Sequence, residues 1–127
     1  MSLENKIKKV FLICPVKDVT PEQRTFLDNY VAELESNGYK VHYPHRDTDQ
    51  SDPIGLEICT TNMNAIKNAD EVHIYWTNKT RGGVFDFGMA FMAGKPLKLV
   101  NPKEVERPKY KTFETVLHVL HEKYALK

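Results

Sequence analysis

The sequence predicts a three-layer α/β/α protein in which a parallel β-sheet lies between layers of helices. Short segments rich in β-branched and aromatic residues alternate along the chain with segments of helical periodicity. The first β-rich segment is apolar throughout, which is typical of a strand buried on both faces of a parallel sheet. The length of 127 residues fits one domain, since domains typically span about 100 to 150 residues. We therefore expect residues 1–127 to form a single α/β domain with four to five parallel strands.

The first strand and the start of the first helix carry the clearest local signals. Residues 9–16, KVFLICPV, predict the first central strand. Thr20 then offers a hydroxyl N-cap, Pro21 suits the first helical position, and Gln23 completes a capping box. At spacings of three and four residues, the helix that follows has an apolar face, which we expect to pack on the sheet: Phe26, Tyr30, Val31 and Leu34.

The next segments continue the alternation of strands and helices. Asn37 and Gly38 end the first helix, because both residues tolerate the left-handed conformation. Residues 40–43 predict a short second strand, and the polar segment 45–53, HRDTDQSDP, predicts an irregular loop. Residues 54–68 then have the pattern of a second helix.

The second half of the chain repeats this order. Residues 71–76, EVHIYW, predict the third strand, and residues 83–93 predict an almost wholly apolar helix. Residues 97–101 predict the fourth strand, and residues 112–124 an amphipathic closing helix. A fifth strand near residues 109–111 would be short.

Three loops should form the binding site of such a fold. Parallel sheets of this kind bind ligands beyond the carboxyl ends of their strands. The loops at residues 15–20, 45–53 and 77–82 follow the first three predicted strands. We therefore expect them to line one site.

Composition excludes several classes of partner. Subtracting 17 acidic residues from 18 Lys and Arg leaves +1, which gives no field able to hold a nucleic-acid polymer. No long apolar run is present for a membrane span, and the first residues lack the apolar core of a signal peptide. The two cysteines do not suggest a disulfide scaffold or a four-ligand zinc cluster. We expect a soluble protein of the reducing cytoplasm.

Two polar residues interrupt predicted apolar surfaces. Asp86 is the only charged residue between Gly82 and Gly94, and we expect it in the first turn of its helix. It could stabilise the helix dipole, worth about 0.3 to 1 kcal/mol, or serve as a pocket carboxylate. Asn62 interrupts an inward stripe and could be a structural bridge to backbone or a site residue near Asp86; the stripe consists of Ile58, Ile66 and Ala69.

Loop cations suggest a phosphate site. Lys17, Thr80 and Arg81 follow the first and third strands, where cations, a hydroxyl and free amides could hold one phosphate. They could equally be solvated surface residues. Gly82 and Gly83 permit a tight turn and close ligand approach, although the segment is neither a Walker A loop nor a dinucleotide-binding glycine motif.

Other reactive residues have simpler interpretations. The pairs His42 with His45 and His118 with His121 lack a third ligand at metal-binding spacing, so we expect no metal. Cys14 could be a nucleophile, but a thiol in a core strand is more often a small buried hydrophobe.

The sequence resembles the nucleoside 2-deoxyribosyltransferase-like family, and within it most nearly the deoxynucleoside 5'-monophosphate N-hydrolases. Residues 68–100, NADEVHIYWTNKTRGGVFDFGMAFMAGKPLKLV, are similar to the family's pattern of strand, glycine-containing loop, acid-bearing helix, Gly-Lys-Pro and strand. Residues 9–17, KVFLICPVK, resemble its opening strand and substrate loop. The resemblance implies a flavodoxin-like (Rossmann-like) fold, no metal or cofactor, and a homodimer or higher homo-oligomer.

The resemblance also implies roles for individual residues. Asp86 takes the place of the nucleophilic glutamate, Asn62 that of a helper aspartate, and Phe11 that of a tyrosine. Lys17 and Thr80 take the places of residues that contact a 5'-phosphate. The implied catalytic residues are thus Asp86 and Asn62, and the implied substrate-binding residues are Phe11, Pro15, Lys17, Thr80, Arg81, Gly82 and Gly83.

Two functions from different classes follow. The resemblance implies an enzyme that cleaves or transfers the N-glycosidic bond of a (deoxy)nucleoside or its 5'-monophosphate through a glycosyl-enzyme intermediate. The altered residues, above all Asn62 and Phe11, leave the alternative of a catalytically impaired nucleotide-binding or sensing domain. If the protein is an enzyme, Asp49, Asp52 or Glu57 could supply the missing acid–base carboxylate.

Overall fold

A computed structural model, which describes residues 6–77, 79 and 81–127, contains a parallel sheet of four strands. The strand order is β2-β1-β3-β4, with β1 and β3 in the centre. The strands span Lys9–Ile13 (β1), Lys40–His42 (β2), Glu71–Ile74 (β3) and Leu97–Leu99 (β4). The predicted α/β/α flavodoxin-like fold is confirmed.

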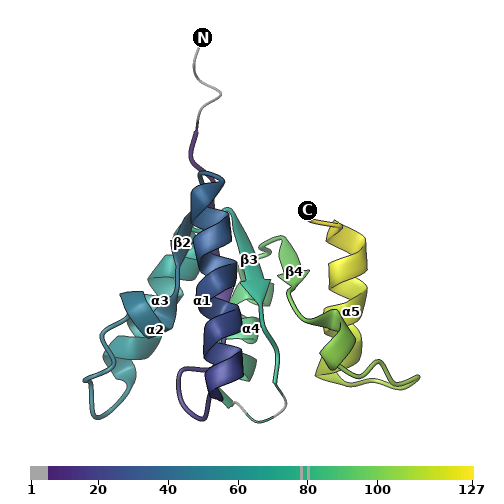
Figure 1. Cartoon of the computed structure of the whole chain (residues 1–127). Coiled ribbons are helices and arrows are strands. Elements are labelled where there is room, and N and C mark those ends of the chain that lie inside the picture. Colours follow the sequence, from purple (N-terminus) through teal and green to yellow (C-terminus); the bar gives the residue numbers. More distant parts are fainter. Residues whose placement is uncertain (1–5, 78, 80) are drawn as a thin grey trace.

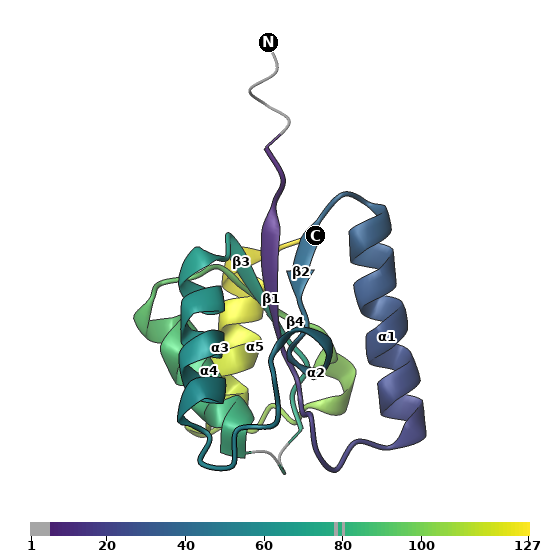
Figure 2. The same ribbon diagram turned by 90° about the vertical axis from the view of Figure 1, so that its left-hand side faces the viewer.

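Helices cover both faces of this sheet. Helix α1 (Pro21–Ser36) lies on one face, whereas α3 (Leu56–Asn68), α4 (Arg81–Met92) and α5 (Phe113–Tyr124) lie on the other (Figures 1 and 2). A short helix, α2 (Pro44–Asp47), follows β2, and a 3-10 turn, η2 (Pro102–Glu104), follows β4. Two apolar clusters, one on each face, form the core. In the part of the chain that the structure describes, no helix is both long enough and apolar enough to cross a bilayer.

Helix α1 begins as the sequence predicts. The Thr20 hydroxyl accepts the N–H of Gln23 at 3.1 Å, and the Gln23 side chain accepts the N–H of Thr20 at 3.0 Å. The predicted apolar face was wrong in one residue, because Phe26 is 45% exposed and Leu27 is buried instead. Phe26 lies at the border of the face, where its ring packs on Tyr75.

The structure corrects two further expectations. The predicted irregular loop contains α2, which forms because Asp47 accepts the N–H of Tyr43 and Pro44 occupies the first helical position. No strand forms at residues 109–111 in the described chain, so the sheet has four strands rather than five.

Side chains cap both open edges of the sheet. On β2, the Arg46 guanidinium donates to the carbonyl oxygen of Val41 at 3.1 Å. On β4, Nδ1 of His121 accepts the N–H of Leu99 at 3.0 Å. Each contact occupies one backbone group at an open edge of the sheet, where another strand could otherwise pair.

Candidate functional site

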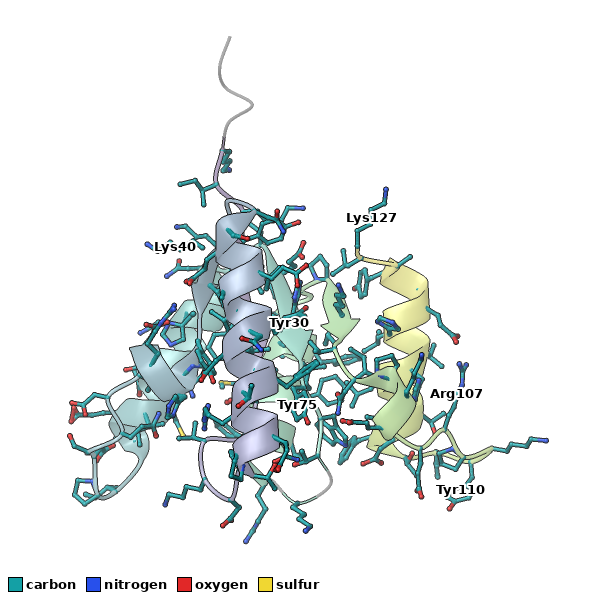
Figure 3. The ribbon with its side chains drawn as sticks, in the orientation of Figure 1. Tyr30, Lys40, Tyr75, Arg107, Tyr110 and Lys127 are labelled. Atoms are coloured by element: carbon teal, nitrogen blue, oxygen red, sulfur yellow. The ribbon has the colours of Figure 1, made fainter. Side chains whose placement is uncertain are left out.

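A cavity of about 1110 Å³ lies at the carboxyl edge of the sheet. The segment after β1, the segment after β3, the amino-terminal turns of α4, and the middle of α3 line it. Tyr75, one of the lining residues, lies beside the first turns of α1, toward the loop end of the molecule (Figure 3). Two of the three predicted loops therefore border the cavity along much of their length, whereas the loop at residues 45–53 contributes only Gln50.

Asp86 provides the cavity with a largely buried carboxylate. It is the sixth residue of α4, because the helix begins at Arg81 rather than at Gly83 as predicted. It therefore lies in the second turn, where the helix dipole is a weaker reason for an acid. Within the described chain, the carboxylate has no hydrogen bond or ion pair. Burial raises the pKa of Asp86 to about 7.

Asn62 of α3 borders the same cavity. Its side chain is buried, with only 7% of the residue exposed, as the apolar stripe predicts. The carbonyl oxygen of its amide accepts the Thr48 hydroxyl at 2.8 Å, so the bridge is to a side chain and not to backbone. The structure thus brings Asn62 and Asp86 to one cavity from two helices.

Three cations line the cavity, and one of them, Arg81, begins α4. Lys17, Lys79 and Arg81 all line the cavity and are exposed. Asp18 adopts a left-handed conformation, with φ of 55°, and so turns the chain sharply directly after Lys17. Cations beside exposed N–H groups of a helix terminus form a suitable environment for an anion. Sequence analysis missed Lys79, although it lies in the same TNKTRG segment as Arg81.

The remaining predicted binding residues fall into three groups. Pro15, Gly82 and Gly83 line the cavity. Gly82 lies in the helix and has no positive φ, so the tight turn expected there is absent, and a Cβ atom would meet nothing within 4 Å. Phe11 is fully buried in the core, stacked on His42, and is not part of the lining. Thr80 lies outside the described residues.

The thiols and histidines are occupied in other ways. Burial raises the pKa of the Cys14 thiol to about 12, so Cys14 is protonated and is a poor nucleophile. His118 contacts the carbonyl oxygen of Val105, and His121 caps β4. Among the described residues, no group of three or more His, Cys, Asp or Glu side chains is placed to hold a metal ion.

Three acidic residues that sequence analysis missed also line the cavity. They are Glu104, Glu106 and Glu114. A carboxylate oxygen of Glu114 accepts the Trp76 indole N–H at 2.8 Å. By contrast, the loop acids that seemed suited to acid–base chemistry from sequence do not line the cavity: Asp49, Asp52 and Glu57. Asp52 instead accepts backbone N–H groups at the start of α3.

Comparison with solved structures gives several similar chains, among them an N-glycosidase and a deoxyribosyltransferase. A CMP N-glycosidase from Clostridium botulinum, BcmB, matches with a TM-score of 0.57 and 22% identity, over 89% of this chain and 82% of that one. A 2-deoxyribosyltransferase from Bacillus psychrosaccharolyticus matches with a TM-score of 0.61 and 18% identity, over 88% of this chain and 95% of that one. No family model matches the sequence, and no curated protein matches it. At these identities the similarity establishes the fold.

Proposed function

We propose that this protein belongs to the nucleoside 2-deoxyribosyltransferase-like proteins and cleaves or transfers the N-glycosidic bond of a (deoxy)nucleoside or its 5'-monophosphate. The observation that carries the proposal is the largely buried Asp86 carboxylate, which borders a cavity without a protein partner among the described residues. An unpaired buried carboxylate lowers stability, so its position calls for a functional explanation. The two similar structures, an N-glycosidase and a deoxyribosyltransferase, support this chemistry.

The proposed mechanism has two displacements at the sugar carbon C1'. The Asp86 carboxylate attacks C1', the C1'–N bond breaks, and its electron pair leaves with the base, which takes up a proton from solvent. Water, or the nitrogen of a second base, then attacks C1' and releases Asp86 from the glycosyl ester. Two displacements at one carbon retain its configuration, as in retaining glycosidases.

The cations that line the cavity would hold a 5'-phosphate. Lys17, Lys79 and Arg81 supply positive charge, and the amino terminus of α4 adds backbone N–H groups. Asp86 follows Arg81 by five residues, which is about 7.5 Å along a helix axis at 1.5 Å per residue. This spacing is on the scale of a 5'-phosphate and the C1' of the same nucleotide.

A substrate panel tests the proposed function. The protein is incubated with ribo- and deoxyribonucleosides and their 5'-monophosphates, with and without an acceptor base, and free base is measured by chromatography. We expect base release or exchange that is absent in Asp86→Ala. Binding of a nucleotide without any product, in folded protein, would contradict the enzyme and favour the binding or sensing domain.

We also propose that a second copy of the chain covers the outer face of α4. This face is apolar, and Phe85, Phe91 and Met92 are 53%, 61% and 88% exposed. Phe113 of α5, which is 56% exposed, extends the apolar surface, since both Phe91 and Phe113 contact the ring of Phe87. Large apolar patches mark protein interfaces. Because Phe85 also lines the cavity, a subunit bound here would close the substrate site.

Light scattering during gel filtration tests this interface. We expect a homodimer or higher oligomer for the wild type and a monomer for the double variant Phe91→Glu and Met92→Glu. Ile7→Glu is the control, because Ile7 is 58% exposed but precedes β1 and belongs to neither α4 nor α5. A monomeric wild type at micromolar concentration would refute the interface.

A further inference from the structure

A chain of polar side chains runs behind the cavity wall, from α3 to β2. The carbonyl oxygen of Asn62 accepts the hydroxyl of Thr48 at 2.8 Å, and the same hydroxyl oxygen lies 2.8 Å from Nε2 of His42. Thr48 is only 4% exposed and Asn62 only 7%. The imidazole of His42 is held in turn by Phe11, on which it stacks with a centroid distance of 5.3 Å and an interplanar angle of 14°.

Counting protons fixes the direction of these hydrogen bonds. A carbonyl oxygen can only accept, so the single hydroxyl proton of Thr48 points to Asn62. The Thr48 oxygen must then accept a proton from His42, which requires the imidazole to carry hydrogen on Nε2. Burial lowers the pKa of His42, against a smaller opposing effect of Asp47, and so favours the neutral ring. A neutral ring with its hydrogen on Nε2 has none on Nδ1.

This direction decides which end of the Asn62 amide meets the substrate. With the carbonyl oxygen bound to Thr48, the NH2 group remains for the cavity, where Asp86 also lies. An NH2 group can donate to a carboxylate or to a sugar oxygen. In the reversed arrangement, with His42 protonated on Nδ1, the amide would present an acceptor to the cavity, which Asp86 also lines, and could not donate there.

We propose that His42 and Thr48 are positioning residues, which hold the Asn62 amide with its NH2 group toward the cavity. The catalytic consequence rests on the proposed glycosidic chemistry, whereas the direction of the hydrogen bonds does not. Because Asn replaces a carboxylate in the pattern that the sequence resembles, a fixed donor at this position would orient Asp86 or the sugar for attack.

The tautomer of His42 is the first test. Two-dimensional 1H–15N NMR correlation of the imidazole ring, on the full chain at pH 7.5 or above, distinguishes the two neutral forms. We expect the proton on Nε2 in the wild type, and loss of that single form in Thr48→Val. A ring protonated on Nδ1 would overturn the proposal, whether or not the protein is an enzyme.

Turnover is the second test. Valine has the shape of threonine without the hydroxyl, so we expect Thr48→Val to lower kcat about 10-fold with KM changed by less than about 2-fold. Thr48→Ser, which keeps the hydroxyl, should retain most of the wild-type kcat and also covers the case in which the valine variant does not fold. Thr60→Val is the matched control, because Thr60 is exposed on α3, the helix that carries Asn62, and its hydroxyl donates to the carbonyl oxygen of Leu56.

The turnover test distinguishes failure of the positioning role from failure of the proposed function. Equal kcat values for Thr48→Val and the wild type, or equal losses for the valine and serine variants, would refute positioning through the hydroxyl. A wild type that releases no base from any substrate would refute the proposed function instead, and the NMR result would still decide the direction of the hydrogen bonds.

Discussion

Asp86→Asn is expected to abolish base release, with a loss in kcat/KM of at least about 1000-fold. Asparagine has nearly the same size and can make hydrogen bonds, but its neutral amide cannot form the glycosyl ester. Glu33→Gln is the matched control, because it removes an exposed carboxylate from α1 on the opposite face of the sheet. Activity of the Asp86→Asn protein within 10-fold of the wild type would exclude Asp86 as the nucleophile.

The pH dependence of the wild type tests the same residue in another way. Only the carboxylate attacks, and burial raises the pKa of Asp86 to about 7. The kcat/KM value should therefore increase with pH up to about 7 and level off above it, since this ratio reports ionisations of the free enzyme. A profile that is already level at pH 5 would mean that another group is the nucleophile.

The stability of Asp86→Asn should change in the direction opposite to its activity. Between pH 3.8, the ordinary pKa of the group, and a pH of about 7, Asp86 is protonated in the folded state and ionised in the unfolded state. The free energy of unfolding therefore falls as pH rises through this range. Asparagine removes that penalty. At pH 8 we expect the variant to be more stable than the wild type, by as much as about 4 kcal/mol, in urea unfolding. A less stable variant would indicate a structural role for the carboxylate.

Local sequence signals predicted the fold because each depends on neighbouring residues. The capping box at Thr20 and Gln23 and the apolar first strand are such signals, and both are present in the structure. The short helix at Pro44 was missed, because it depends on Asp47 reaching back to the N–H of Tyr43. The contact between Leu99 and His121 at the edge of the sheet is likewise tertiary, and no local pattern indicated it.

The partners of polar residues inside the core also could not be predicted from local sequence. His73 is fully buried in β3, although its sequence context predicts only a strand. It is satisfied by Tyr30 from α1 and by Glu71, each at 2.7 Å. Neither partner could be chosen from spacing along the chain, because the Tyr30 contact joins residues that lie 43 positions apart.

The sequence predicted those candidate site residues whose position follows from the topology of the sheet. Asn62, Lys17, Arg81 and Asp86 all border the cavity, because α3, α4 and the loop after β1 meet at the carboxyl edge of a parallel sheet. Phe11 could not be placed in this way, since strand residues alternate between faces and its side chain points into the core. Glu104 and Glu106 come from a connection without regular structure in the sequence pattern, so no periodicity indicated them, whereas Glu114 lies in the first turn of the predicted closing helix.

Removing the two predicted phosphate-binding cations should lower activity on 5'-monophosphates far more than activity on nucleosides. We expect the double variant Lys17→Met and Arg81→Met to lower kcat/KM for 5'-monophosphates about 100-fold or more, because a hydrogen bond to a charged group contributes about 1.5 to 3 kcal/mol. Nucleosides without the phosphate should change by less than about 3-fold, since they make no contact with these cations. Initial rates on a nucleoside and its own 5'-monophosphate, measured side by side, give the comparison.

A charge-matched variant separates local binding from the net charge of the protein. Lys40→Met and Lys127→Met also remove two positive charges, but both residues lie toward the end of the molecule away from the loops (Figure 3). This control should keep the wild-type preference between nucleotide and nucleoside. If the Lys17 and Arg81 variant lost activity equally on both substrates, the cations would serve the structure of the loops and not a phosphate, and the nucleoside itself would be the better candidate substrate.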